Sequence, residues 1–265
     1  MSQARRILIT GGSQGLGAAV ARKLTDLGHV PVIVDIANPT DTEFEYHRVD
    51  LSDFESISSF VDGLNDPIDG LVNAAGVPGT CAADLVMRVN FAGLRELTER
   101  IVDKFTPTTV VHVSSLSASN WAESKSRIAP LIAARGFEAA VDWCRTADLS
   151  DSESYVFSKM AVIVLTTQQA AEFKDQGVRV NCVSPGPIDT RLLQDFKDSM
   201  GANHIDTAIQ LAGGPGTPEG IAPVIAFLST EDSIWVNGSN VNTDGGLHAF
   251  RSVANDTSLH AVAAK

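Results

Sequence analysis

The sequence predicts a single α/β domain, in which about seven parallel strands form one doubly wound sheet with helices on both faces. Short apolar runs alternate with helical patterns along the 265 residues, as in parallel strands joined by helices. Runs such as VVHV and VIV are continuously apolar, which is typical of strands buried on both sides. A glycine-rich turn also follows the first run. The length fits one domain with a sizeable core.

Seven apolar runs are interpreted as strands, and most of the intervening segments as helices. In chain order, the strands are expected at residues 7–10, 30–36, 44–50, 69–76, 109–115, 178–186 and 239–246. The motifs described below follow the carboxyl ends of these runs, where open α/β sheets bind their ligands.

Two longer connections interrupt the regular alternation. Residues 116–154 are expected to form a helical insertion with one amphipathic helix, because apolar residues recur at spacings of three to five. These residues are Ile128, Leu131, Ile132, Phe137, Val141 and Cys144. Residues 187–218 carry Gly201 and the cluster GGPGTP, and we expect them to form a mobile lid with glycine hinges over the substrate. This segment is called the lid below.

Composition and charge narrow the possible partners. The formal net charge of −12 argues against nucleic acid or an anionic membrane, which attract clustered Lys and Arg. The sequence has no signal-peptide pattern and no apolar run long enough to span a membrane, so we expect a soluble cytoplasmic protein. Neither the three cysteines nor the scattered histidines have metal-ligand spacing, so neither a disulfide nor a metal site is expected.

The turn TGGSQGLG contains Gly11, Gly15 and Gly17 between the first strand and its helix. Residues without Cβ let the backbone approach a pyrophosphate at a helix N-terminus, which makes the sheet Rossmann-like; a merely tight turn is the alternative. Asp35 ends the second strand, where a carboxylate accepts hydrogen bonds from adenosine ribose and repels a 2′-phosphate. We therefore expect NAD as the cofactor. Asp50 either meets adenine or caps the following helix.

Tyr155 and Lys159 lie four residues apart in SESYVFSKMAVIV, so a helix presents both on one face. A phenol is a weak base near neutral pH. A neighbouring ammonium stabilises the phenolate and makes proton transfer at Tyr155 accessible. The pair alone is a common surface pattern, but the upstream dinucleotide motif favours a catalytic role.

Together these motifs resemble the short-chain dehydrogenase/reductase superfamily, and the resemblance runs from Ile7 to about Gly246. In the family's order, the chain has TGGSQGLG, NAAG at 73–76, Asn90, the pair Ser114–Ser115, Tyr155 with Lys159, and PGPIDT at 185–190. NAAG replaces the commoner NNAG. A short segment between Gly76 and Asn90 and a long one before Tyr155 resemble the branch of bacterial 3α-hydroxysteroid dehydrogenase/carbonyl reductase and coniferyl alcohol dehydrogenase.

The resemblance implies a catalytic set of Asn90, Ser115, Tyr155 and Lys159. It favours Ser115 over Ser114 because the catalytic serine is usually the second of such a pair. Asn90 would retain a water next to Lys159, or alternatively pair with helix backbone. The implied cofactor contacts are Gly11, Ser13, Gln14, Gly15, Leu16, Gly17, Asp35, Asp50, Leu51, Asn73, Ala74, Ala75, Gly76, Tyr155, Lys159, Pro185, Gly186, Ile188 and Thr190.

The function implied is NAD-dependent interconversion of a secondary alcohol and its ketone. Candidate pocket walls are mostly apolar and include residues 117–121 and the lid side chains Leu192, Leu193, Phe196 and Met200, which favours an aromatic or steroid-like substrate; Arg191 is the exception. The alternatives are a primary, coniferyl-type alcohol dehydrogenase and a catalytically silent NAD-sensing regulator. Many members of the family dimerise through a helix pair, which the insertion either covers or extends with a contact to a partner subunit. We expect a homo-oligomer, either dimer or tetramer.

Overall fold

The computed structural model describes residues 3–41 and 43–255, and seven parallel strands form one sheet within these ranges. The strand order is β3-β2-β1-β4-β5-β6-β7. Their bounds are Arg6–Thr10 (β1), Val30–Asp35 (β2), Glu45–Arg48 (β3), Gly70–Asn73 (β4), Thr109–Val113 (β5), Arg179–Pro185 (β6) and Asn240–Thr243 (β7). The winding reverses between β1 and β4, where Thr10 pairs with Asn73. The predicted fold class is confirmed, although most strands are shorter than expected.

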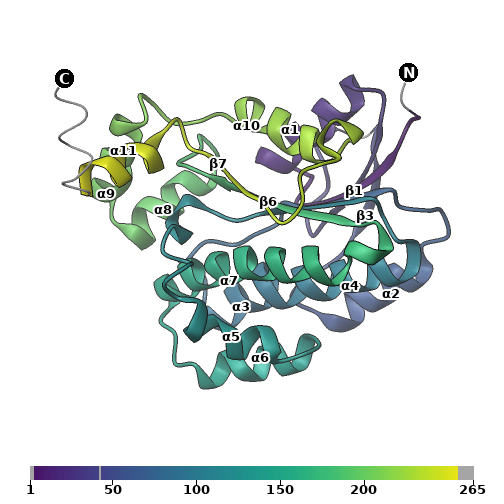
Figure 1. Ribbon diagram of the computed structural model, residues 1–265, viewed down its shortest axis with the longest axis horizontal. Helices are drawn as coiled ribbons and strands as arrows, with labels where there is room; N and C mark the ends of the chain where they lie inside the picture. Colours follow the sequence, from purple (N-terminus) through teal and green to yellow (C-terminus); the bar gives the residue numbers. More distant parts are fainter. Residues whose placement is uncertain (1–2, 42, 256–265) are drawn as a thin grey trace.

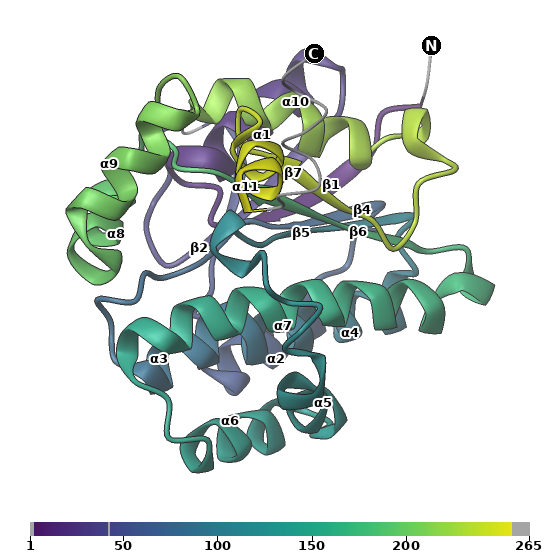
Figure 2. The same ribbon diagram turned by 60° about the vertical axis from the view of Figure 1, so that its left-hand side comes forward.

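Helices cover both faces of the sheet. Figures 1 and 2 show α1 and α10 on one face and α2, α4 and α7 on the other, with α5 and α6 outside α7. The α-helices are Gly15–Asp26 (α1), Phe54–Gly63 (α2), Ala83–Met87 (α3), Leu94–Phe105 (α4), Lys125–Ala133 (α5), Phe137–Thr146 (α6), Asp151–Glu172 (α7), Leu192–Met200 (α8), Ala202–Leu211 (α9), Pro218–Leu228 (α10) and Leu247–Asn255 (α11). A π-helix, η1, spans Arg88–Gly93, and 3₁₀-helices span Leu116–Ala118 (η2), Lys174–Gln176 (η3) and Glu231–Ser233 (η4).

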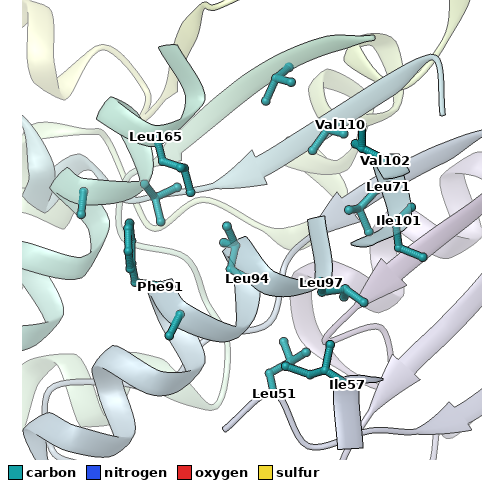
Figure 3. Packing of buried hydrophobic residues seen from close by; sticks show 14 of the residues in the cluster. Leu51, Ile57, Leu71, Phe91, Leu94, Leu97, Ile101, Val102, Val110 and Leu165 are labelled. Atoms are coloured by element: carbon teal, nitrogen blue, oxygen red, sulfur yellow. The ribbon is translucent and has the colours of Figure 1, made fainter. Parts of the chain in front are cut away.

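The apolar runs are buried because the sheet lies between two hydrophobic layers. In β1, Ile7 and Ile9 belong to the core beneath α1 and α10, whereas Leu8 belongs to the core beneath α2, α4 and α7. Figure 3 shows the second layer, in which Leu71 and Val110 of the sheet lie near residues of α4. Burial on both faces explains why these strands lack an apolar–polar alternation.

Helix α7 carries the Tyr and Lys pair in its first turns, and its start is well defined. Ser150 accepts a hydrogen bond from the Glu153 backbone, and the Glu153 side chain accepts one from the Ser150 backbone, forming a capping box. This arrangement satisfies two backbone donors that the first turn of a helix otherwise leaves unpaired. Within residues 3–41 and 43–255, no helix combines the length and apolar character needed to cross a membrane.

The insertion at 116–154 contains η2 and two helices, α5 and α6, and ends inside the first turn of α7. The expectation of one amphipathic helix is therefore wrong. Gly136 interrupts it with a φ of 83°, a left-handed conformation that few other residues adopt. Ile128 and Leu131 of α5 and Phe137 of α6 are nevertheless all buried. A helical hairpin keeps both apolar stripes facing inward, so the spacing did not reveal the break.

The lid contains two helices, α8 and α9, which Figure 2 shows beyond one end of the sheet. They meet at Gly201, which has a φ of 93°. The two ends of the lid lie together, because Ile188 forms a bridge with Gly216 and the Asp189 N–H donates to the Gly216 carbonyl. Helix α11 follows the last strand and was not expected from the sequence. The tail beyond it, including His260, lies outside the described residues.

Candidate active site

Tyr155 and Lys159 lie side by side in the first turns of α7. Both side chains are buried, with 6% and 5% exposure. The Lys159 ammonium lies 5.8 Å from the centre of the Tyr155 ring and donates a hydrogen bond of 3.0 Å to the Val113 carbonyl at the end of β5. The helix thus holds a phenol and an ammonium together at the carboxyl edge of the sheet.

Burial changes the proton affinity of both groups. It raises the pKa of Tyr155 to about 12, although a hydrogen bond with Ser115 acts in the opposite direction. It lowers the pKa of Lys159 to about 8, because a charged ammonium is poorly solvated in the interior. The sequence predicts that Lys159 stabilises the Tyr155 phenolate. Within the chain alone, however, burial disfavours this phenolate more strongly than neighbouring groups stabilise it.

Ser114 and Ser115 follow β5 and have different surroundings. The Ser114 hydroxyl is buried and donates to the backbone carbonyl of Lys159 over 2.7 Å. The Ser115 hydroxyl accepts hydrogen bonds from the backbone and the hydroxyl of Ser117 and lies beside the Tyr155 phenol. Ser114 therefore ties β5 to α7, while Ser115 is placed to contact a substrate oxygen.

Asn90 is fully buried in the π-helix η1, and π-helical turns occur frequently at functional sites. Its carbonyl oxygen accepts from the Val77 N–H over 2.8 Å, and its amide donates to the Val77 carbonyl over 3.0 Å. A Cβ on neighbouring Gly76 would lie 3.3 Å from both Asn90 and the Lys159 ammonium. Asn90 is thus close to Lys159, and its backbone partner is the loop after β4 and not its own helix.

The glycine turn packs too tightly for side chains. A Cβ on Gly17 would lie 2.2 Å from the Gly11 carbonyl oxygen, and one on Gly11 would lie 2.7 Å from the Ala75 backbone. The N-terminus of α1 has no side-chain cap at Gln14 and no acidic residue in its first turn. Its backbone N–H groups are thus suited to an anion such as a pyrophosphate, which is what a bound dinucleotide requires.

Asp35 lies at the end of β2 and faces the glycine turn. Its carboxylate oxygens accept hydrogen bonds of 3.1 Å from the Ser13 and Ala37 backbones. Asp50 does not cap α2, contrary to one of the two roles predicted for it from the sequence. Asp53 is the N-cap, and the Asp50 side chain accepts from Ser52. The capping role for Asp50 is wrong, and a contact with adenine stays a prediction.

The remaining predicted cofactor contacts lie along the same edge. The Ala75 N–H donates to the Thr10 hydroxyl of β1, linking the NAAG segment to the strand before the glycine turn. Gly186, after β6, lies so near Asp244 that a Cβ would approach its backbone to 3.0 Å. Thr190 lies beside Gly15, with 3.8 Å between the Thr190 methyl and a Cβ placed on Gly15. Two further predicted residues, Asn73 and Pro185, are the last residues of β4 and β6, and Leu51 lies three residues beyond the end of β3.

Two cavities border α7, and neither is lined by Tyr155 or Lys159. One of about 100 Å³ borders Ser115 and has polar walls that include Asn240 and His248. The other, of about 320 Å³, lies between α7, the insertion and the lid. Its lining is mostly apolar and consists of Arg127, Ser152, Glu153, Val156, Phe157, Met160, Ser199 and Met200. The insertion and the lid both line this cavity, and Met200 is the one of the four expected lid side chains that does so. Their role as substrate-pocket walls stays a prediction.

Sequence reasoning missed two contacts that position the candidate catalytic side chains. Both partners are backbone groups, the Val77 peptide for Asn90 and the Val113 carbonyl for Lys159. Neither valine has a side chain that could mark its role. Their positions, in the loop after β4 for Val77 and at the end of β5 for Val113, were the available signal.

A sheet with this strand order, with a Tyr and Lys pair close to its glycine turn, defines an oxidoreductase of the dinucleotide-binding α/β class. A family model described as enoyl-(acyl carrier protein) reductase matches residues 11–248. The chain belongs to the short-chain dehydrogenase/reductase family, which confirms the resemblance described above.

Three relatives illustrate where it lies in that family. The coniferyl-alcohol dehydrogenase of Pseudomonas sp. (strain HR199) is 36% identical over 92% of this chain and 96% of its own length. The 3-alpha-hydroxysteroid dehydrogenase/carbonyl reductase of Comamonas testosteroni is 31% identical over 92% and 96%. The crystal structure of the 3-alpha-hydroxysteroid dehydrogenase from Pseudomonas sp. B-0831, complexed with NADH, has a TM-score of 0.80, 28% identity and coverage of 95% and 99%.

Proposed function

We propose that this protein is an NAD-dependent dehydrogenase that interconverts a hydrophobic secondary alcohol and its ketone. The observation that carries the proposal is the grouping of Ser115, Tyr155 and Lys159 at the carboxyl edge of a sheet whose glycine turn can hold a dinucleotide. This combination of groups can support proton transfer at a substrate oxygen and hydride transfer at the adjacent carbon.

The position of Asp35 supports NAD as the cofactor. Its carboxylate lies beside the Ser13 backbone at the end of β2, where it can bind ribose hydroxyls and repels the 2′-phosphate of NADP. The structural neighbour from Pseudomonas sp. B-0831 is described as complexed with NADH. The oxidised form of bound NAD would add a positive charge near Tyr155. It would also accept a hydride from the alcohol carbon.

Each catalytic side chain then has a defined role. In the oxidative direction, Tyr155 accepts the alcohol proton, and Ser115 donates a hydrogen bond to the oxygen that gains carbonyl character. Lys159 holds the nicotinamide ribose and favours the phenolate. Asn90, which the Val77 backbone holds in place, retains a water next to Lys159. Reduction uses the same groups in reverse.

The larger cavity supports a hydrophobic substrate. Val156, Phe157, Met160 and Met200 supply its apolar walls, and Arg127 and Glu153 lie at the same cavity. Two relatives are named as hydroxysteroid dehydrogenases, and an aromatic or steroid-like alcohol fits such walls. A second candidate is a primary aromatic alcohol, which is favoured by the 36% identity with a coniferyl-alcohol dehydrogenase.

The test is NADH formation with hydroxysteroids, benzylic secondary alcohols, primary cinnamyl-type alcohols and polyols, each supplied with NAD and with NADP. We expect turnover of a secondary alcohol with NAD. Preference for the cinnamyl-type alcohols would instead establish the second candidate. Tyr155→Phe serves as the control and should bind NADH without turnover. NADH binding by the wild type with no activity on the panel would support the regulator alternative.

A further inference from the structure

Arg191 lies on the cofactor side of the lid and not on the substrate wall. It directly precedes α8, and its guanidinium donates a hydrogen bond of 3.3 Å to the side-chain carbonyl of Gln14. Gln14 is the N-cap of α1. The preceding residue, Thr190, packs against Gly15. Two contacts therefore place the start of the lid against the turn that would bind the dinucleotide.

The guanidinium has a neutral partner in this position. Arg191 is exposed and forms no ion pair within 4.0 Å with another described residue. The first turn of α1 carries no acidic residue that could compensate the charge. An exposed cation with a neutral partner thus lies at the N-terminus of α1, where backbone N–H groups are suited to an anion.

We infer that Arg191 binds the diphosphate of the dinucleotide and, through this contact, holds the lid helix α8 over the active site. The inference rests on the proposed dinucleotide cofactor. A guanidinium offers paired donors that match two phosphate oxygens, and its bond to a charged partner is stronger than its bond to the neutral Gln14 carbonyl. The protein has a net charge of −12, so a local cation is also needed to offset repulsion of an anionic ligand.

The lid has two further contacts that would transmit this binding. Asp195 of α8 accepts a hydrogen bond of 3.2 Å from Thr80 in the loop after β4. One residue further on, the Phe196 ring lies 5.1 Å from the Tyr155 ring. Arg191 stands immediately before α8, so fixing its position on the diphosphate would restrain the helix that covers Tyr155.

The test compares Arg191→Gln and Arg191→Lys with the wild type and with Arg22→Gln. Arg22 is a suitable control because it is an exposed arginine of α1 that pairs with Glu219. Calorimetry would give the Kd of NADH, ADP-ribose and adenosine at low and high salt. We expect Arg191→Gln to weaken NADH and ADP-ribose about 10-fold at low salt, with a smaller difference at high salt. Adenosine binding should not change, and Arg191→Lys should recover part of the affinity.

Hydrogen exchange of residues 192–200 tests the coupling to the lid. NADH should slow exchange there in the wild type and in Arg22→Gln, and should slow it less in Arg191→Gln. A wild type that binds no NADH would overturn the proposed function itself. Normal wild-type binding with equal affinity in Arg191→Gln, or an equal loss of affinity for adenosine, would overturn the role of Arg191 alone. Equal protection of 192–200 in all variants would overturn the coupling.

Discussion

The Phe196 ring of the lid lies 5.1 Å from the Tyr155 ring of α7, with an angle of 51° between the two planes. This contact covers the proposed acid and base with a side chain from a segment more than 40 residues downstream. Tyr155 is 6% exposed, and burial is the main cause of its raised pKa. The position of the lid therefore bears directly on the chemistry of the phenol.

Phe196→Ala should lower the pKa of Tyr155 from its value of about 12. Removing the ring admits water to the phenol and reduces the cost of forming its anion. At a given pH between 10 and 12, a larger fraction of the variant should therefore be phenolate. The chain has only two tyrosines, so ultraviolet titration in a Tyr46→Phe background reports Tyr155 alone. Circular dichroism would identify the pH values at which both proteins remain folded, and the titrations would be compared only at those values.

Leu192→Ala is the matched control for this titration, because Leu192 is an exposed residue of the same helix. It should leave the midpoint unchanged, and the denatured protein should titrate near pH 10. An identical midpoint with and without Phe196 would show that the lid does not set the solvation of Tyr155.

Ser115→Ala should mainly lower the turnover rate, whereas Ser114→Ala should mainly lower the stability of the fold. Ser115 lies beside the phenol, and loss of a donor to the reacting oxygen typically lowers the turnover rate about 10²-fold or more. Ser114 donates to the Lys159 carbonyl in the interior, so its removal should lower the free energy of unfolding by about 1–2 kcal/mol. Initial rates and denaturant unfolding of both variants check this. A greater loss of activity in Ser114→Ala would reverse the assignment.

The features predicted correctly from the sequence depend on local patterns. Alternating apolar runs and helices indicated seven parallel strands, which the structure confirms. The glycine spacing marked the turn before α1, whereas Tyr155 stood out only together with that turn, and its catalytic role stays a prediction. The Ser115 assignment needed the family resemblance, because two adjacent serines look alike until their partners are known. Family motifs therefore supplied what periodicity could not.

The features that sequence did not predict depend on contacts between distant segments. Asn90 is held by the backbone of Val77, and a backbone partner carries no residue-type signal. The break at Gly136 was hidden because both halves of the hairpin bury their apolar residues. The contact between Phe196 and Tyr155 depends on how the lid folds back, which spacing within the lid does not determine.

Asp35→Asn should shift cofactor preference toward NADP. The change removes the charge that repels a 2′-phosphate but keeps one oxygen to accept from the Ser13 or Ala37 backbone. We expect the ratio of kcat/KM for NAD to that for NADP to fall about 10-fold, which corresponds to about 1.4 kcal/mol. Asp26→Asn, an exposed change at the end of α1, should leave the ratio alone. An unchanged ratio in Asp35→Asn would remove the structural basis for proposing NAD.

Arg95→Met should destabilise the protein through the insertion. Arg95 is 1% exposed, and its guanidinium donates to the carbonyls of Ala134 and Gly136, between α5 and α6. Burial lowers its pKa, but five protein oxygens around it, four backbone carbonyls and the Glu99 carboxylate at 3.9 Å, favour the cation. Methionine fills much of the volume but removes the donor to the Ala134 carbonyl, whereas the Gly136 carbonyl still accepts from the Ala140 N–H.

We expect Arg95→Met to lower the free energy of unfolding by about 2–4 kcal/mol, because breaking a buried ionic network leaves several polar groups without partners. Arg100→Met is the matched control on the same helix. Arg100 pairs with Glu96 at 2.7 Å near the surface, and such pairs contribute about 1 kcal/mol or less. Guanidinium unfolding gives both values, and hydrogen exchange should show the Arg95 loss at residues 134–136 first. Equal effects of the two changes would mean that Arg95 does not anchor the insertion.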